Sequence, residues 1–155
     1  MKVSNILLNL ANLVKRIKQL EYKLGLIDDF VVDHGIGVTT ADGSIWEYFK
    51  YESGLVDMWG YRSVANISPY TTFSFGNNIY AYCRQTTMTY PFTLTSVPLV
   101  MPNNTIASAF TMSTVVDSEI YVDYVKMFGF DWHIGTAGSG GERFVARCHL
   151  IGTWK

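Results

Sequence analysis

Charged residues are scarce in this 155-residue chain, and neither sign is in excess. Lys and Arg number 12 and Asp and Glu number 13, so the formal net charge is −1, and charged residues make up 16% of the sequence. An average soluble domain has about 25%. Proteins that bind nucleic acids use a basic surface to release counterions from phosphate, and this chain has no basic excess to form one. We therefore expect no nucleic-acid partner.

The sequence also lacks a long apolar run. Its longest strongly apolar stretch, residues 6–14, is interrupted by Asn9 and Asn12, whereas a membrane-spanning helix needs about 20 apolar residues. The N-terminal residues follow a helical pattern and contain no small-residue cleavage site of the kind that ends a secretory signal. We expect neither membrane insertion nor an export signal.

Cysteine is rare as well. Cys83 and Cys148 form neither a C-x-x-C pair nor a metal-ligand spacing, which favours two packed thiols over a disulfide. An acidic cluster at residues 28–33, followed by His34, could bind a cation if a threefold axis gathered three copies. An acidic linker is the commoner explanation of such a cluster. We expect no metal and no cofactor.

The residue patterns of hydrolases are missing. There is no G-x-S-x-G elbow, and the Gly-Ser-Gly at residues 138–140 stands in a glycine-rich segment without the strand-to-helix context of that motif. A glycosidase needs two carboxylates across a cleft. Glu47 and Asp57 are candidates, but on paired strands of a hairpin they are more simply solvated side chains. We expect a binding protein rather than an enzyme.

Aromatic and apolar residues are abundant. The chain has 4 Trp, 10 Tyr and 9 Phe, and hydrophobic residues make up 48% of it. This content excludes a disordered chain, because disordered segments lack the apolar residues to build a core. Combined with so little charge, it leaves more apolar surface than one small domain can hide, which indicates an oligomer.

The first 24 residues follow a heptad repeat. Apolar residues recur with the alternating three- and four-residue spacing of positions a and d over three heptads, and Gly25 is suited to cap the helix. This regular period favours a coiled coil over a helix that lies on the following domain. The residues assigned to trimerisation are Val3, Ile6, Leu10, Leu13, Arg16, Ile17, Leu20, Glu21 and Leu24.

Two features of the heptads favour three strands. Leu7 and Val14 at position e widen the apolar stripe beyond what a dimer buries. Arg16 at position g and Glu21 at position e resemble the trimerisation motif of parallel three-stranded coiled coils, in which Arg pairs with Glu of the neighbouring helix. A solvated charge pair within one helix is the alternative. We predict a parallel homotrimer.

After Gly25 the pattern changes to short strands separated by turns rich in Gly, Pro and Asn. We divide the chain into a coiled-coil trimerisation stalk (1–26), a linker (27–44) with a possible short strand at 30–32, and a β-sandwich head domain (45–155). Strands are predicted at 45–51, 55–61, 71–75, 79–84, 92–95, 97–101, 106–116, 119–132 and 143–154. Many short strands without a second helix predict a mainly β fold, an antiparallel β-sandwich or barrel-like head.

Four segments of the chain resemble a known family. Residues 46–60 read W-E-Y-F-K-Y-E-S-G-L-V-D-M-W-G, which is similar to the W-x-Y-x-K-W-x-S-G-x-x-E-x-W-G pattern near the C-terminal end of tail-fibre and minor structural proteins of bacteriophages and prophages. Residues 30–35 resemble the strand and glycine that precede this pattern, residues 90–98 resemble its Y-P-F-x-F-x-S-x-P segment, and residues 151–155 resemble its terminal I-G-R-W-K. The resemblance runs from about residue 30 to the last residue.

The chain departs mildly from the family pattern, with Tyr51 for Trp, Asp57 for Glu and Thr153 for Arg. The shared residues are aromatic and turn residues, and we expect Trp46 and Trp59 to be committed to core or inter-subunit packing. The resemblance implies the terminal knob of a fibre in a phage tail virion or a prophage-derived tail-like particle. Such a knob is a trimer on a coiled-coil stalk that contacts the host surface and adjoins other tail or baseplate proteins.

Receptor contacts are expected from turns, because loops on a rigid β scaffold commonly carry binding. Aromatic and amide side chains near turns are of the kind that orient a polar ligand such as a saccharide. Our candidates for contact with a bacterial cell-surface glycan or other receptor are Tyr70, Asn77, Asn78, Asn103, Asn104 and His133. Two alternatives stay open: a purely structural fibre or trimerisation segment without its own receptor site and, less favoured, a surface-glycan hydrolase.

Overall fold

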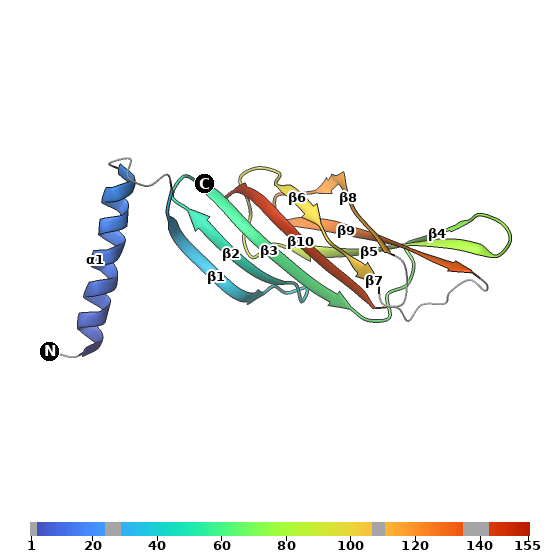
Figure 1. Ribbon diagram of the computed structural model, residues 1–155, viewed down its shortest axis with the longest axis horizontal. Coiled ribbons are helices and arrows are strands. Elements are labelled where there is room, and N and C mark those ends of the chain that lie inside the picture. Colours follow the sequence, from blue (N-terminus) through green and yellow to red (C-terminus); the bar gives the residue numbers. More distant parts are fainter. Residues whose placement is uncertain (1–2, 24–28, 107–110, 135–142) are drawn as a thin grey trace.

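The computed structural model describes residues 3–23, 29–106, 111–134 and 143–155. Within these ranges the chain forms one helix and ten strands, and the helix stands apart from the strands (Figure 1). The elements are α1 (Val3–Lys23), β1 (Val31–Thr39), β2 (Ile45–Tyr51), β3 (Leu55–Val64), β4 (Thr71–Ser74), β5 (Ile79–Thr89), β6 (Leu99–Pro102), β7 (Thr105–Ile106), β8 (Thr111–Ile120), β9 (Tyr124–Ile134) and β10 (Phe144–Thr153).

The strands form two antiparallel sheets. The six-stranded sheet has the order β1-β2-β3-β10-β6, with β7 also paired to β10, and the four-stranded sheet has the order β4-β5-β9-β8. The two sheets lie in separate layers (Figure 1). Buried side chains from both fill the space between them, among them Trp46, Met58 and Leu150 from the larger sheet and Met88 and Met127 from the smaller. The prediction of a mainly β, antiparallel fold is confirmed.

The hairpin of β2 and β3 follows directly from the sequence pattern. Side chains along β3 alternate between buried and more exposed positions, as expected for a strand with one face on the core. The turn between the two strands uses Gly54 at φ 96°, a conformation that suits glycine. Trp46 of β2 pairs with Gly60 of β3, and a Cβ on that glycine would lie 2.5 Å from the Trp46 ring. Gly60 therefore leaves the space that the buried indole fills.

The motif residues meet in one cluster around Lys50. Its ammonium lies 3.7 Å from the centroid of the Phe92 ring, 5.2 Å from that of Trp154 and 5.3 Å from that of Tyr48, and it forms an ion pair with Asp33 at 3.3 Å. A cation over several aromatic faces is electrostatically attracted to each of them. The cluster ties β1, β2, the segment after β5 and the C-terminus together, which gives these motif residues a structural role.

Asp42, in the turn between β1 and β2, links the two sheets. Its carboxylate accepts hydrogen bonds from the Thr40 hydroxyl (2.7 Å) and from the backbone N–H groups of Ser44 and Thr89 (both 2.9 Å). Arg62 lies 3.4 Å from the same carboxylate. Burial alone raises the pKa of Asp42, but the hydrogen bonds outweigh it and hold that pKa far below its ordinary value. Because Thr89 belongs to β5, this carboxylate joins the smaller sheet to the larger.

The segment predicted as a linker contains a longer strand than expected. β1 extends over nine residues and pairs with β2. Two register shifts, between Val31 and Asp33 and between Gly35 and Val38, interrupt its alternation. Such bulges remove the period of two on which strand prediction depends. The 27–44 segment thus contributes β1 to the head domain.

Two other segments differ from the predicted strands. Residues 92–95 are irregular because Pro91 and Pro98 flank them. The Leu94 N–H donates to Val122 O at 2.7 Å, and the Thr95 N–H donates to Thr153 O of β10 at 2.9 Å, so neighbouring residues bond to different segments. Of the strand predicted at 106–116, Ile106 belongs to β7 and residues 111–116 belong to β8, and residues 107–110 lie outside the described residues. The strand predicted at 119–132 begins only at Tyr124, since a turn precedes it.

Helix α1 has 21 residues, in agreement with the predicted helix. Its described apolar side chains Leu13, Val14, Ile17 and Leu20 are 46–59% exposed, and within the described residues no strand packs closely against it. Leu24 lies outside the described residues. The side chains of Val3, Ile6 and Leu10 are likewise not among those described. A single chain does not test the coiled coil, which stays a prediction.

Candidate functional site

Three of the predicted receptor contacts lie on the hairpin of β4 and β5. This hairpin projects at the end of the head opposite α1 (Figure 1). Asn77 and Asn78 form its turn with φ of 48° and 58°, after Gly76 at φ 78°. Both Asn side chains are exposed, and Tyr70, just before β4, is 69% exposed. Asparagine is among the few residues that tolerate positive φ, so this turn presents two amides to solvent for a local structural reason.

Of the other three predicted contacts, His133 lies near this hairpin and the two asparagines do not. His133 is placed by its backbone alone, in β9 opposite Tyr80 of β5, and its side chain is outside the described part of the structure. Asn103 is exposed in the turn between β6 and β7, where its N–H donates to Arg147 O at 2.8 Å. The six residues therefore divide between the β4–β5 end and the β6–β7 turn.

The prediction for Asn104 is wrong. This residue is only 3% exposed, and its side-chain amide donates to Phe128 O at 2.8 Å while its Oδ1 accepts from the Arg147 N–H at 3.3 Å. A buried polar side chain needs such partners, because an unsatisfied one would cost about 1–3 kcal/mol. Asn104 joins the two sheets at a position that turn chemistry alone made look like an exposed loop.

A different surface emerges on the outward face of the six-stranded sheet. Trp59, expected in core or inter-subunit packing, is 42% exposed there in the single chain, whereas its motif partner Trp46 is 1% exposed on the inward face. Eight large apolar side chains, each 39–63% exposed, share this face, and we call them the outer apolar face. They are Val31 of β1, Ile45 of β2, Leu55, Trp59 and Tyr61 of β3, Leu99 and Met101 of β6, and Ile151 of β10.

Trp59 is held by its cross-strand neighbours. Its ring stacks on His149 at 4.7 Å between centroids with an interplanar angle of 4°, and it meets Phe49 edge-on at 6.1 Å. His149 in turn forms a hydrogen-bonded pair with Asp57 through Nε2. Arg147 lies over the Tyr61 ring at 5.5 Å from its centroid. The centre of the face is thus a pre-ordered arrangement of aromatic rings with polar groups between them.

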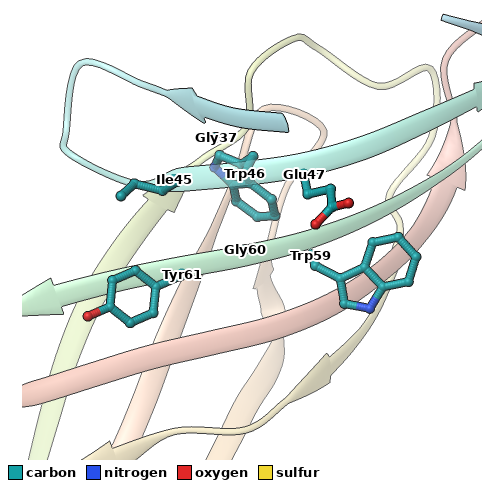
Figure 2. A pocket seen from close by; sticks show the side chains of 7 residues that line it. All are labelled: Gly37, Ile45, Trp46, Glu47, Trp59, Gly60 and Tyr61. Carbon is teal, nitrogen blue, oxygen red and sulfur yellow. The ribbon is translucent and has the colours of Figure 1, made fainter. Parts of the chain in front are cut away.

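Two shallow hollows flank Trp59. One, of about 240 Å³, lies where the start of β2 meets the middle of β3, and Glu47, Trp59 and Tyr61 surround Gly60 there (Figure 2). The other, of about 400 Å³, lies on the β10 and β6 side and is lined in part by Met101, Asn103, Arg147 and His149. Asn103 is therefore the one predicted contact that borders the Trp59 surface.

Sequence reasoning missed this surface although a signal was present. Glu47 pairs with Trp59 and Trp46 pairs with Gly60, so alternation places Trp46 and Trp59 on opposite faces. Glu47, Asp57, Arg147 and His149 fall on the outward positions of the same strands. An aromatic residue that shares a strand face with charged residues is one that faces outward.

Two carboxylates of the acidic cluster, considered as possible metal ligands, are held by other residues of the chain. Asp29 accepts hydrogen bonds from the Ser53 hydroxyl and N–H, and these outweigh the effect of desolvation and lower the pKa of Asp29. Asp33 pairs with Lys50, and Asp28 lies outside the described residues. Burial raises the pKa of the Cys148 thiol to about 12, so it stays protonated at neutral pH.

The described residues contain no group of three His, Cys, Asp or Glu side chains placed to hold a metal ion. They also contain no helix long and apolar enough to cross a membrane.

Comparison with solved structures gives a structural likeness. No protein-family model and no curated protein matches the chain. Among solved structures, the Pseudomonas aeruginosa R1 pyocin fibre fragment comprising C-terminal residues 323–701 is similar, with a TM-score of 0.43 and 18% sequence identity. The likeness covers 76% of this chain and 33% of that chain, so this chain spans about a third of the pyocin fragment. At this level of similarity, function has to be argued from the chain's own residues.

Proposed function

We propose that this chain is the receptor-binding end of a trimeric fibre of a phage tail or tail-like particle. In this proposal α1 holds three copies in parallel, the β domain forms the head, and the head binds a saccharide or other receptor on a bacterial cell surface. The family-like motif at residues 46–60 supports the fibre assignment. Its aromatic residues around Lys50 build the head, as a motif shared for architectural reasons would.

The observation that carries the proposal is the uncovered apolar stripe of α1. Leu13, Ile17 and Leu20 occupy positions a and d, yet each is about half exposed in the single chain. An isolated helix of this length is marginal in water, so its stability has to come from burial of that stripe against other helices. Parallel copies of the same helix supply the matching heptads. Each fibre end then presents three identical heads.

Three heads change what each binding site must achieve. The exposed turn residues Tyr70, Asn77, Asn78 and Asn103 offer a ring and three amides, which suit weak, partly hydrated contacts to sugar hydroxyls. A monovalent site of about millimolar affinity corresponds to only about 4 kcal/mol. Linking three sites on one rigid trimer raises the avidity by about 10²–10⁴-fold through effective concentration.

The test measures assembly and adsorption together. Light scattering on the purified chain should give the mass of a trimer, and Ile17→Asp should give a smaller species because it places a charge at the seam in each helix. The labelled trimer is then mixed with intact bacteria and purified wall polysaccharides, and bound protein and released reducing ends are measured. Binding without cleavage is the expected result.

Variants of the turn residues locate the binding site. Asn77→Gly and Asn78→Gly remove the amides while keeping a residue that accepts positive φ, and Tyr70→Ala removes the exposed ring. Thr39→Ala at the end of β1 is the control. Release of reducing ends would indicate the hydrolase alternative. Absence of binding to any surface would indicate a structural fibre segment, and adsorption that survives every turn variant would place the site elsewhere.

A further inference from the structure

The outer apolar face is too large to be ordinary solvent-exposed surface. Its eight side chains expose roughly 700 Å² in sum if each large side chain offers about 150–250 Å² when fully exposed. The largest apolar patch on a typical monomer is about 300–600 Å², and a standard protein interface buries about 800 Å² on each partner. The face therefore has the area of an interface, and a monomeric head would leave it in water.

Nothing within the described part of the chain covers this face. The four-stranded sheet packs on the opposite, inward face, and α1 stands apart from both sheets (Figure 1). The apolar stripe of α1 is itself exposed and has the heptad period of a helix that pairs with copies of itself. The same partner, a second copy of this chain, can cover both surfaces.

The charges on the face are arranged for such a contact. Asp57 and His149 already pair with each other beside Trp59. Glu47 of β2 and Arg147 of β10 lie on opposite sides of β3. Three copies related by a threefold axis form head-to-tail contacts, in which the β2 side of one copy can meet the β10 side of the next. That arrangement can bring Glu47 of one copy to Arg147 of its neighbour, with the exposed rings between them.

We propose that the outer apolar face is the interface between heads, with a second copy of this chain as its occupant and Trp59 as its central anchor. The inference rests on the trimer of the proposed function and extends it from the stalk to the head. Large aromatic residues near the centre of an interface contribute most of its binding energy, whereas rim residues contribute little. The head trimer is thus held by Trp59, Tyr61 and their apolar neighbours, and the Glu47–Arg147 pair sets its rotation.

Analytical ultracentrifugation of four variants of the 155-residue chain tests the proposal. Ile17→Asp disables the stalk, and the heads should still self-associate at about 100 μM, a range in which weak interfaces are populated. Adding Trp59→Glu to Ile17→Asp should weaken this association about 30-fold or more. Adding Phe73→Glu instead is the matched control, since Phe73 is a similarly exposed aromatic residue on the four-stranded sheet. Trp59→Glu alone should stay trimeric through the stalk but expand in hydrodynamic radius.

Charge reversal supplies a readout that survives a folding defect in any one variant. On the Ile17→Asp background, Glu47→Arg and Arg147→Glu should each weaken association, and the double exchange should restore most of it. Circular dichroism and thermal melting establish that each variant is folded.

Four results would overturn the interface. They are a strictly monomeric Ile17→Asp variant at about 100 μM, equal effects of Trp59→Glu and Phe73→Glu, no rescue by the double exchange, and a compact Trp59→Glu trimer that has lost host-cell binding. The last result would make Trp59 a receptor contact. A wild-type chain that assembles through Trp59 whether or not Ile17 is replaced would contradict the stalk of the proposed function while leaving the head interface in place.

Discussion

The two faces of the six-stranded sheet carry similar residues in opposite circumstances. The inward face presents Trp46, Met58 and Leu150, all at most 1% exposed, and the outward face presents Trp59, Tyr61 and Ile151 at about 40%. One hairpin supplies four of these six residues. A strand that is apolar on both faces is usually covered on both. The comparison teaches that the two tryptophans of the motif have different environments, because Trp46 belongs to the core of the single chain and Trp59 lies on its surface.

The inward aromatic residue is fixed by more than apolar contact. The Trp46 indole donates to Thr89 O at 2.7 Å and meets the Tyr90 ring edge-on at 5.4 Å. The outward Trp59 stacks on His149, meets Phe49 edge-on and remains 42% exposed. Substitutions on the inward face therefore report on the stability of the head, and substitutions on the outward face report on its contacts with other molecules.

The largest difference should come from truncating both tryptophans. Trp46→Ala removes a buried ring and leaves Thr89 O without its donor, so the free energy of unfolding should fall by about 4 kcal/mol. Trp59→Ala, measured below the concentration at which heads associate, should cost about 1 kcal/mol or less because its ring is already half in solvent. Urea unfolding followed by circular dichroism measures both. Equal losses would mean that the two faces are equally committed to the fold.

A second pair of variants adds side chains instead of removing them. In Gly60→Val the new Cβ would lie 2.5–2.7 Å from atoms of Trp46 and Met88, so the buried indole must move, at a cost of about 3 kcal/mol. Ser63→Val, at an exposed position three residues along the same strand, should change stability by about 0.5 kcal/mol or less. A Gly60→Val protein with a wild-type melting curve would show that the Trp46 ring can move to accommodate the new side chain without loss of stability.

The sequence predicted well those elements whose residue pattern keeps a regular period, and poorly those whose period is interrupted. The hairpin of β2 and β3 and the helix α1 have unbroken periods of two and of heptads, and both were predicted at nearly their observed positions. β1 was underestimated because two bulges interrupt its alternation. Asn104 was misassigned because its burial depends on Phe128 and Arg147, which are distant in sequence. For Trp59 the prediction left core and inter-subunit packing open, and its pairing with Glu47 excludes the core by placing it on the outward face.

The third prediction concerns Asp42, whose hydrogen bonds join the turn between β1 and β2 to β5. Asp42→Ala removes the acceptor for Thr40, Ser44 and Thr89, and at pH 7 it should lower the free energy of unfolding by about 2 kcal/mol. The pKa of Asp42 is lower in the folded state than in the unfolded chain, so its contribution is fully present above about pH 4 and declines as the pH falls below that value. The gap between wild type and variant should therefore narrow at pH 3. Urea titrations at both pH values measure it, and a gap that widens in acid would contradict the assignment.

The smallest effect is expected at Tyr90, whose ring packs against Trp46 of the inward face. The Tyr90 hydroxyl is buried and has no hydrogen-bond partner among the described residues. Tyr90→Phe keeps the ring against Trp46 and removes that hydroxyl, so stability should be unchanged or higher by up to about 1 kcal/mol. Burial also raises the pKa of Tyr90, so the wild-type protein should lose stability as the pH rises above about 10, where the unfolded phenol ionises. Cys148 contributes in the same direction in both proteins, and the difference between them isolates Tyr90. Thermal melting of the pair at pH 7 and at pH 10.5 (about half a unit above the ordinary phenol pKa) should show the variant gaining on the wild type. A clear loss of stability in Tyr90→Phe at pH 7 would contradict this prediction, because it would show that the Tyr90 hydroxyl makes a hydrogen bond in the folded protein.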